Sequence, residues 1–360
     1  MNYRITPIDP LISRDARSFG AGSPMHTLNW LSQTVVAGTI RTALYKAGEN
    51  LETIKQIKIR GSFPLLNDEM YFPRPLDIVK SSSNIYQIKP MKEFPSDSGA
   101  NMPLNNLMPS QPDADEDFKP EKLNAFWKRE LMIKWLNNGK IDFALNDEDT
   151  LPMHSHDERV HACIDPATGI SRDGNLFSTT GLDFIRRDEA NKTFINSQIS
   201  IDIEADLPEK FTAAIGGERR LADFIRSDND KTLWKYPSEL PEKFDSSFHL
   251  ILATPAIFSK GWLPDWINEN DLTGTIPNTN AKVKLISAVT DRWLPVSGWG
   301  YERGQTGHKP MRRAVPSGSV YFFDVIEGTL TAKDVWLKSV CCKEQDINDG
   351  FGLVLIGRGE

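Results

Sequence analysis

The 360-residue sequence has little cysteine, no long apolar run and no excess of positive charge. Its three cysteines, Cys163, Cys341 and Cys342, are too few for a disulfide framework, which predicts a reducing compartment and a cytoplasmic protein. The longest apolar stretch, residues 248–258, is interrupted by polar residues and falls short of the ~18–20 residues that span a bilayer. The first ten residues contain no apolar secretory core, so neither a signal peptide nor a membrane segment is expected.

The charge balance is acidic, with 42 Lys and Arg against 49 Asp and Glu and a formal net charge of −7. That balance excludes a protein that coats nucleic acid by bulk charge. The acidic residues are concentrated, because residues 97–121 carry a balance of −5 and residues 142–158 a balance of −6. The remaining chain therefore sums to +4. Both acidic stretches are typical of a solvated surface.

Common enzyme motifs are also missing, since the sequence has no P-loop, no GxSxG and no HExxH. The glycine-rich residues 350–359 lack the following helix that a dinucleotide-binding fingerprint needs. A metal site is one hypothesis for His154, His156, His161 and Cys163, which lie within ten residues. The alternative is that a loop and a strand hold these residues without a ligand. We predict no metal site and no cofactor.

The sequence does contain alternating strand and helix patterns, and its length predicts about two domains at ~100–200 residues each. Strands are expected at residues 55–66, 194–205, 248–254, 281–290, 319–326, 333–340 and 351–357, with a hairpin of residues 159–165 and 175–185 around a turn at 166–169. Helices are expected at residues 27–47, capped by Thr27 and ended by Gly48, at 121–139 and near 262–270. The proline-rich residues 90–120 predict a long loop, and residues 231–247 predict a domain boundary. This rhythm favours an α+β fold with helices packed on antiparallel sheets.

Basic residues gather in three glycine-containing loops: the first loop (residues 13–24), the second loop (216–220) and the third loop (298–313). Glycine lets backbone amides approach an anion closely, and arginine donates in a fork that fits phosphate oxygens. Phe19, Trp299 and Tyr301 add faces on which bases can stack. A salt-bridged surface is enough to explain any single loop. Three such loops in one acidic chain favour a protein that binds an anionic polymer.

Several ordered segments resemble the Cmr subunit three family of RAMP-superfamily proteins, which belong to type III-B CRISPR effector complexes. They are RDARSFGAGSP (14–24), AGTIRTALY (37–45), ERVHACIDPATGISRDGNLFST (158–179), IGGERRLADF (215–224), SGWGYERGQTGHKPMRRAVPSGSVYFF (297–323) and GFGLVLIG (350–357). The resemblance implies two ferredoxin-like (RRM-like) domains with antiparallel sheets, at residues 1–238 and 239–360. An acidic and helical insertion at about residues 90–150 has no counterpart in the family pattern.

The resemblance also implies a non-catalytic role in antiviral defence. The subunit would hold the repeat-derived 5′ tag of the crRNA and bridge the large cyclase/polymerase-like subunit to the backbone subunit. The RNA-binding residues implied by the matching motifs are Arg14, Arg17, Gly20, Gly22, Arg41, Gly216, Gly217, Arg219, Arg220, Lys309, Arg312 and Arg313.

A metal-independent endoribonuclease that processes precursor crRNA is the alternative function. His26 and His308 lie in or beside the basic loops, and histidine suits acid–base catalysis near neutral pH. Sequence spacing alone does not show that these side chains converge.

Overall fold

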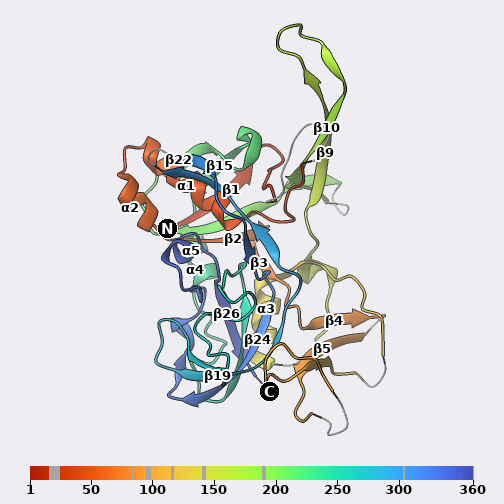
Figure 1. Cartoon of the computed structure of the whole chain (residues 1–360), viewed down its shortest axis with the longest axis vertical. Helices are drawn as coiled ribbons and strands as arrows, with labels where there is room; N and C mark the ends of the chain where they lie inside the picture. Colours follow the sequence, from red (N-terminus) through yellow and green to blue (C-terminus); the bar gives the residue numbers. More distant parts are fainter. Residues whose placement is uncertain are drawn as a thin grey trace. The chain divides into compact units, whose positions relative to one another are not determined.

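The chain forms two compact units, and each unit is built from three separate segments of the sequence (Figure 1). The computed structural model describes residues 1–15, 25–82, 84–94, 99–114, 117–139, 143–188, 192–302 and 305–359. Unit 1 consists of Met1–Asp68, Met153–Asp228 and Pro295–Arg312, and unit 2 of Glu69–Pro152, Asn229–Leu294 and Arg313–Glu360. The domains expected at 1–238 and 239–360 stay a prediction.

Five strands of unit 1 are hydrogen-bonded in the order β14-β15-β1-β13-β2, and each described pair is antiparallel. They are β1 (Asn2–Pro7), β2 (Ile59–Leu66), β13 (Gln198–Ile203), β14 (Lys210–Ala214) and β15 (Leu221–Arg226). Alternate residues such as Tyr3, Ile5 and Ile199 are fully buried in one apolar core. The strand expected at 55–66 is present but shorter, because α2 (Leu51–Gln56) precedes β2. The strand expected at 194–205 is divided into β12 (Thr193–Asn196) and β13.

Helix α1 (Gln33–Lys46) packs its apolar stripe, including Val36, Ile40 and Leu44, into this core. It begins six residues after the expected start at Thr27, and Ser32 occupies the N-cap position. The Thr27 hydroxyl instead donates to the Ser13 carbonyl oxygen at 3.0 Å. Long-range hydrogen bonds therefore hold this segment in an extended conformation, which local periodicity does not reveal.

Three hairpins extend the sheet region of unit 1. They are β9 (Ser155–Ile164) with β10 (Ser171–Asp183), β11 (Ile185–Asp188) with β12 (Thr193–Asn196), and β21 (Trp299–Glu302) with β22 (Gln305–His308). The β9–β10 hairpin projects as a long arm from the rest of its unit (Figure 1). It confirms the hairpin expected from alternation and from the turn at 166–169, where Gly169 has φ of 71°.

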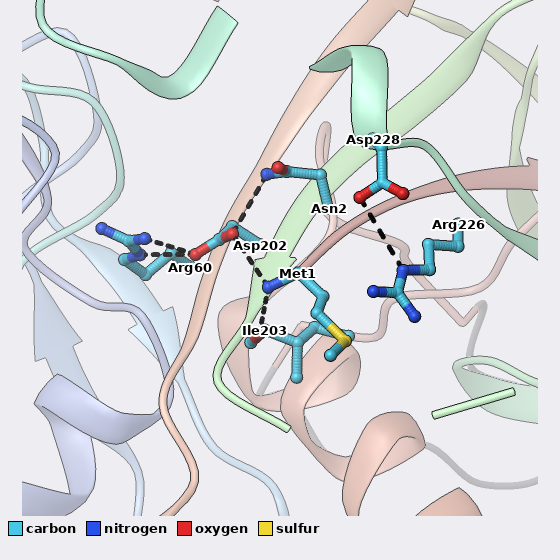
Figure 2. A network of polar contacts seen from close by, with 7 residues as sticks. All are labelled: Met1, Asn2, Arg60, Asp202, Ile203, Arg226 and Asp228. Atoms are coloured by element: carbon cyan, nitrogen blue, oxygen red, sulfur yellow. Dashed lines mark hydrogen bonds and ion pairs between the residues drawn. The ribbon is translucent and has the colours of Figure 1, made fainter. Parts of the chain in front are cut away.

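Asp202 on β13 ties the first residues of the chain to the sheet (Figure 2). Its carboxylate accepts from Asn2 Nδ2 at 3.0 Å and from Arg60 Nε at 2.9 Å. The Met1 amino group donates to the Ile203 carbonyl oxygen at 2.6 Å. Since Asp202 is 7% exposed, these charge-assisted bonds compensate for the loss of hydration of a nearly buried carboxylate.

Unit 2 is built on five strands in the order β18-β19-β24-β17-β26. They are β17 (Ser247–Leu252), β18 (Thr273–Thr275), β19 (Lys282–Val289), β24 (Val320–Glu327) and β26 (Val354–Arg358). The strands expected at 248–254, 281–290, 319–326 and 351–357 are confirmed within a few residues. The strand expected at 333–340 and the helix expected near 262–270 are both wrong. Turns and isolated bridges, such as Ser339↔Leu353, occupy these stretches instead.

The two sheets share one strand order. In unit 1 the order is β15-β1-β13-β2, so β13 lies between β1 and β2, the two strands that precede it in the chain. In unit 2 the order is β26-β17-β24-β19, so β24 likewise lies between β17 and β19. In unit 1 the connection from β1 to β2 contains α1. In unit 2 the connection from β17 to β19 contains only turns, bridges and the short β18.

The insertion contains more regular structure than a loop. Its helix, α3 (Arg129–Asn138), ends at Gly139 in the left-handed conformation, as expected, but starts eight residues late because β7 (Phe126–Lys128) pairs with β3 (Glu69–Pro73). Within the expected loop of residues 90–120, β6 (Ser110–Pro112) joins a sheet with β5 (Asn84–Pro90). The remaining elements are β4 (Ile78–Ser81), β8 (Thr150–Leu151), β16 (Lys243–Phe244), β20 (Leu294–Val296), β23 (Arg312–Ala314), β25 (Leu330–Thr331), α4 (Lys231–Trp234) and α5 (Glu344–Asn348). In the described ranges, no helix combines the length and apolar character of a membrane span.

His249 on β17 is 1% exposed and lies against Trp135 of α3, with ring centroids 4.3 Å apart. Its β26 neighbour is Gly357, where a Cβ would lie 2.5 Å from His249 Nε2, so only glycine fits there without a shift. Burial lowers the pKa of His249 to about 3, which keeps the imidazole neutral in the folded protein.

We expect His249 to make unfolding easier in acid. The unfolded histidine binds a proton below about pH 6.5, so the free energy of unfolding falls as the pH drops from there toward 3, by ~1.4 kcal/mol per pH unit and group. His249→Gln should flatten this dependence in urea titrations between pH 4 and 7. The control variant His156→Gln, at an exposed histidine, should retain the pH dependence of the wild type. Equal slopes of unfolding free energy against pH for wild type and His249→Gln would contradict the prediction.

Candidate functional site

The first and second basic loops meet in unit 1 at a backbone contact of Ile12. Ile12 forms a parallel bridge with Gly216, and the Gly217 amide donates to the Ile12 carbonyl oxygen at 2.7 Å. Gly216 has φ 77° and ψ −155°, a conformation that is essentially limited to glycine. A Cβ on Gly216 would lie 2.2 Å from the Ile12 carbonyl oxygen. Both sterics and backbone conformation thus require glycine at the start of the second loop.

The second loop turns back sharply and presents its two arginines differently. Glu218 and Arg219 both have positive φ, 59° and 51°, and the Ile215 amide donates to the Arg220 carbonyl oxygen at 2.8 Å. Arg219 is exposed, whereas Arg220 is half-buried and its Nε lacks a hydrogen-bond partner. In the described part of the chain, neither guanidinium lies within 4 Å of a carboxylate.

The first turn of α1 connects the first loop to the third. Ser13 Oγ accepts from the Ser32 amide at 2.9 Å, directly before α1. Thr34, the second residue of α1, donates its Oγ1 hydroxyl to the Ser297 carbonyl oxygen at 3.3 Å. Ser297 Oγ in turn donates to the Lys309 carbonyl oxygen at 2.8 Å. Segments more than 250 residues apart in sequence, such as Thr34 and Ser297, are thereby joined around one helix N-terminus.

The structure places the predicted RNA-binding residues unevenly. Arg17, Gly20 and Gly22 lie outside the described residues. Arg14 is exposed and forms a bridge with Thr27, beside the first-loop contacts.

The third loop contributes Lys309, which is exposed and whose amide donates to the Gly298 carbonyl oxygen at 2.8 Å. Arg312 is half-buried and belongs to unit 1, while the exposed Arg313 belongs to unit 2. The contacts described for unit 1 thus join Arg14, Gly216, Gly217 and Lys309 to one connected set of loops, with Arg219 and Arg220 in the second-loop turn.

Arg41 lies apart from these loop contacts, in the second half of α1. Its Nε donates to the Ile54 carbonyl oxygen at 3.3 Å and so holds the end of α2. This contact gives Arg41 a structural task, and its role in RNA binding stays a prediction.

His154 lies in an apolar environment beside the first-loop contacts. Its ring centroid is 5.2 Å from that of Trp30 and 4.6 Å from that of Phe184, and its Nε2 is 3.1 Å from Ser197 Oγ. Burial, with a smaller contribution from Arg186, lowers the pKa of His154 to about 3. The imidazole is therefore a neutral core group.

The other residues of the metal-site hypothesis lie along the β9–β10 hairpin. His161 stacks on Phe177, with centroids 5.1 Å apart, and its Nε2 is 2.9 Å from Thr179 Oγ1. Among the residues that the structure describes, no group of three or more His, Cys, Asp or Glu side chains is placed to hold a metal ion.

Sequence reasoning missed the small polar residues that assemble the site, Ser13, Thr27, Ser32, Thr34 and Ser297. Their hydroxyls replace secondary structure as bonding partners of the loop backbone. The one available signal was that Ser13 begins the first loop and that Ser297 directly precedes the third. Serine and threonine are so common in loops that this signal is weak.

Residues 3–359 match the model of a family described as "CRISPR-associated protein (Cas_Cmr3)". A chain in the cryo-EM structure of the type III-B Cmr-beta bound to cognate target RNA and AMPPnP, state 1, aligns with a TM-score of 0.51 at 16% identity, covering 89% of this chain and 86% of that one. The corresponding chain without AMPPnP aligns with a TM-score of 0.49 at 17% identity and the same coverage.

A chain of the Csm3–Csm4 subcomplex from the type III-A interference complex aligns at 11% identity with a TM-score of 0.36, covering 92% of this chain and 97% of that one. No curated protein sequence matches the chain significantly. The similarity to the Cmr-beta chain at a TM-score of 0.51 shows a shared sheet-rich mixed fold with few helices.

Gly216→Ala should destabilise the protein by about 3 kcal/mol, because it combines a forbidden backbone conformation with a clash against the Ile12 carbonyl. Urea denaturation followed by circular dichroism measures this loss. Gly38→Ala is the matched control, since Gly38 lies in the interior of α1 with open space around its Cα. That variant should gain up to about 1 kcal/mol, and equal midpoints for the two variants would refute the constraint at Gly216.

Proposed function

This chain belongs to the Cas_Cmr3 family of CRISPR-associated proteins, and from that premise we propose that it is a non-catalytic, crRNA-binding subunit of a type III-B Cmr effector complex. In this role it holds the repeat-derived 5′ tag of the crRNA and bridges the large cyclase/polymerase-like subunit to the backbone subunit. The Cmr-beta chain that it resembles comes from a complex bound to cognate target RNA, which supports an RNA ligand. The proposal places the protein in the cytoplasm, where crRNA is found.

One observation carries this proposal: the basic loops are joined around the first turn of α1. Arg14, Arg219 and Lys309 are all exposed on segments that the contacts of Ile12, Ser13 and Ser297 connect. Arg219 and Arg220 have no carboxylate within ion-pair distance among the described residues, which keeps their donors available for phosphate oxygens. A short RNA segment is the ligand whose repeating phosphates match several separate cations.

The shared strand order supports two ferredoxin-like domains. In a βαββαβ fold the first two strands flank the third, as β1 and β2 flank β13, and as β17 and β19 flank β24. In unit 1 α1 supplies the first helix of that fold, while the second helical connection is replaced by β14 and the second loop. The insertion at 90–150 adds α3 and part of the β4–β5–β6 sheet to unit 2.

Arg219→Gln combined with Arg220→Gln should lower the affinity for 5′-tagged crRNA by at least about tenfold, because two charge-assisted contacts are lost. The slope of log K against log salt should fall by about 1.4, at ~0.7 per phosphate for single strands. Fluorescence anisotropy with labelled crRNA across a salt series measures both values.

The matched control for these two arginines is Lys333→Gln combined with Lys338→Gln in unit 2. It removes the same charge, but each lysine is already paired, with Glu242 and Asp334, at 3.9 Å. This variant should bind like wild type. If both double variants and the wild type shared one affinity and one salt slope, the second loop would not be part of the RNA site.

A non-catalytic subunit should leave repeat RNA intact. We expect the purified protein to produce no site-specific cleavage in EDTA, and His26→Ala and His308→Ala to behave like wild type. Denaturing gels of end-labelled repeat RNA provide the measurement. Cleavage that is lost in either histidine variant would instead establish the endoribonuclease function.

A further inference from the structure

Trp293 and Arg313 form an exposed cation–π pair in unit 2. The Arg313 guanidinium carbon lies 4.9 Å from the centroid of the indole ring. Trp293 is 42% exposed, and it is the one exposed tryptophan among those whose side chains the structure describes. The exposed part of this indole, beside a cation, is an aromatic surface that a ligand can reach.

The charge around this indole is positive and unpaired. Arg292, the preceding residue, is exposed, as is Arg313. Within the described chain, neither guanidinium has a carboxylate at ion-pair distance. The neighbouring acid, Asp291, is turned to the backbone, where its Oδ1 accepts from the Arg292 amide at 2.6 Å. The pair thus offers an aromatic face together with guanidinium donors that form no ion pair among the described residues.

The position of the pair along the chain relates it to the third loop. Trp293 precedes residues 295–312, and Arg313 follows them, so the pair closes the base of the segment that carries Lys309. Sequence reasoning identified Arg313 but not Trp293.

We propose that Trp293 and Arg313 form a stacking site for one nucleobase of single-stranded RNA. Arg313 packs over the indole ring and orders both side chains, so that a base can stack on the exposed part of the indole while the guanidinium N–H groups meet the adjacent phosphate. An acidic peptide would use the arginines alone and an apolar peptide the indole alone, whereas a nucleotide uses both. The inference rests on the proposed function, because it names a further contact for the same RNA.

The test compares Trp293→Ala, Trp293→Phe and Arg313→Gln in the full-length protein, with the labelled 5′-tagged crRNA as probe. Trp293→Ala should weaken binding about tenfold with an unchanged salt slope, because a stacked base carries no net charge. Trp293→Phe should retain most of the affinity. Arg313→Gln should also reduce the salt slope by about 0.7, the share of one phosphate contact.

A second measurement does not depend on how the variants fold. Crosslinking of crRNA that contains 4-thiouridine to the wild-type protein, followed by peptide mass spectrometry, should identify the peptide that contains Trp293. Wild-type binding with no such crosslink, together with unaltered affinity of Trp293→Ala, would overturn the stacking site and leave the proposed function intact. Absence of crRNA binding by the wild-type protein, alone and in the assembled complex, would overturn both. A pair that only closes the loop would lower the melting temperature of Trp293→Ala without a crosslink, which also overturns the site.

Discussion

The contact between Gly216 and the Ile12 carbonyl is the constraint on which the proposed site depends. A side chain of any size at residue 216 would push the second loop away from the segment that leads into the first. Because Gly217 bonds the same carbonyl, the turn that carries Arg219 and Arg220 is fixed to the end of that segment. The next residue after Ile12, Ser13, then accepts from the Ser32 amide, so the contact continues directly into α1.

The packing beneath these loops is apolar and neutral, which gives the polar contacts above it a rigid base. His154 is held uncharged between Trp30 and Phe184, and Trp30 Nε1 donates to Ser62 Oγ at 3.0 Å on β2. A protonated imidazole here would place a buried charge beside Arg186, which burial disfavours. In the proposed site, the charge of the ligand would therefore be met by the cations of the loops.

Much of the sheet architecture was predictable, because the alternation along β19 and the apolar runs of β17 and β24 depend on residues within each strand. The start of α1 was not, since the hydrogen bonds that hold Thr27 extended come from Ser13 and from Thr180, 153 residues away. The expected strand at 333–340 fails for a similar reason: its alternate apolar residues are buried among turns rather than in a ladder.

The candidate site divides in the same way. Glycine and arginine at residues 216–220 marked the second loop directly, because the backbone conformation of Gly216 requires glycine and a cationic loop needs basic side chains. The serine and threonine residues that join the loops have no comparable sequence signal, since a serine side chain fits almost any exposed backbone. The sequence pattern therefore marks the residues that we propose to meet the ligand more directly than the residues that position the loops.

The acidic total of the chain is compatible with this site because charge acts locally. At physiological salt, exposed charges interact over only about 8 Å, so a net charge of −7 says little about any one loop. Some acids of the two acidic stretches are paired near their own positions, as in Lys89–Asp113 at 3.1 Å and Arg159–Asp157 at 2.6 Å. Arg219, Arg220 and Arg313 have no such partners in the described chain. The relevant quantity for RNA binding is consequently the number of unpaired cations that the fold brings to connected loops, and that number is set by a few backbone contacts around Ile12 and α1.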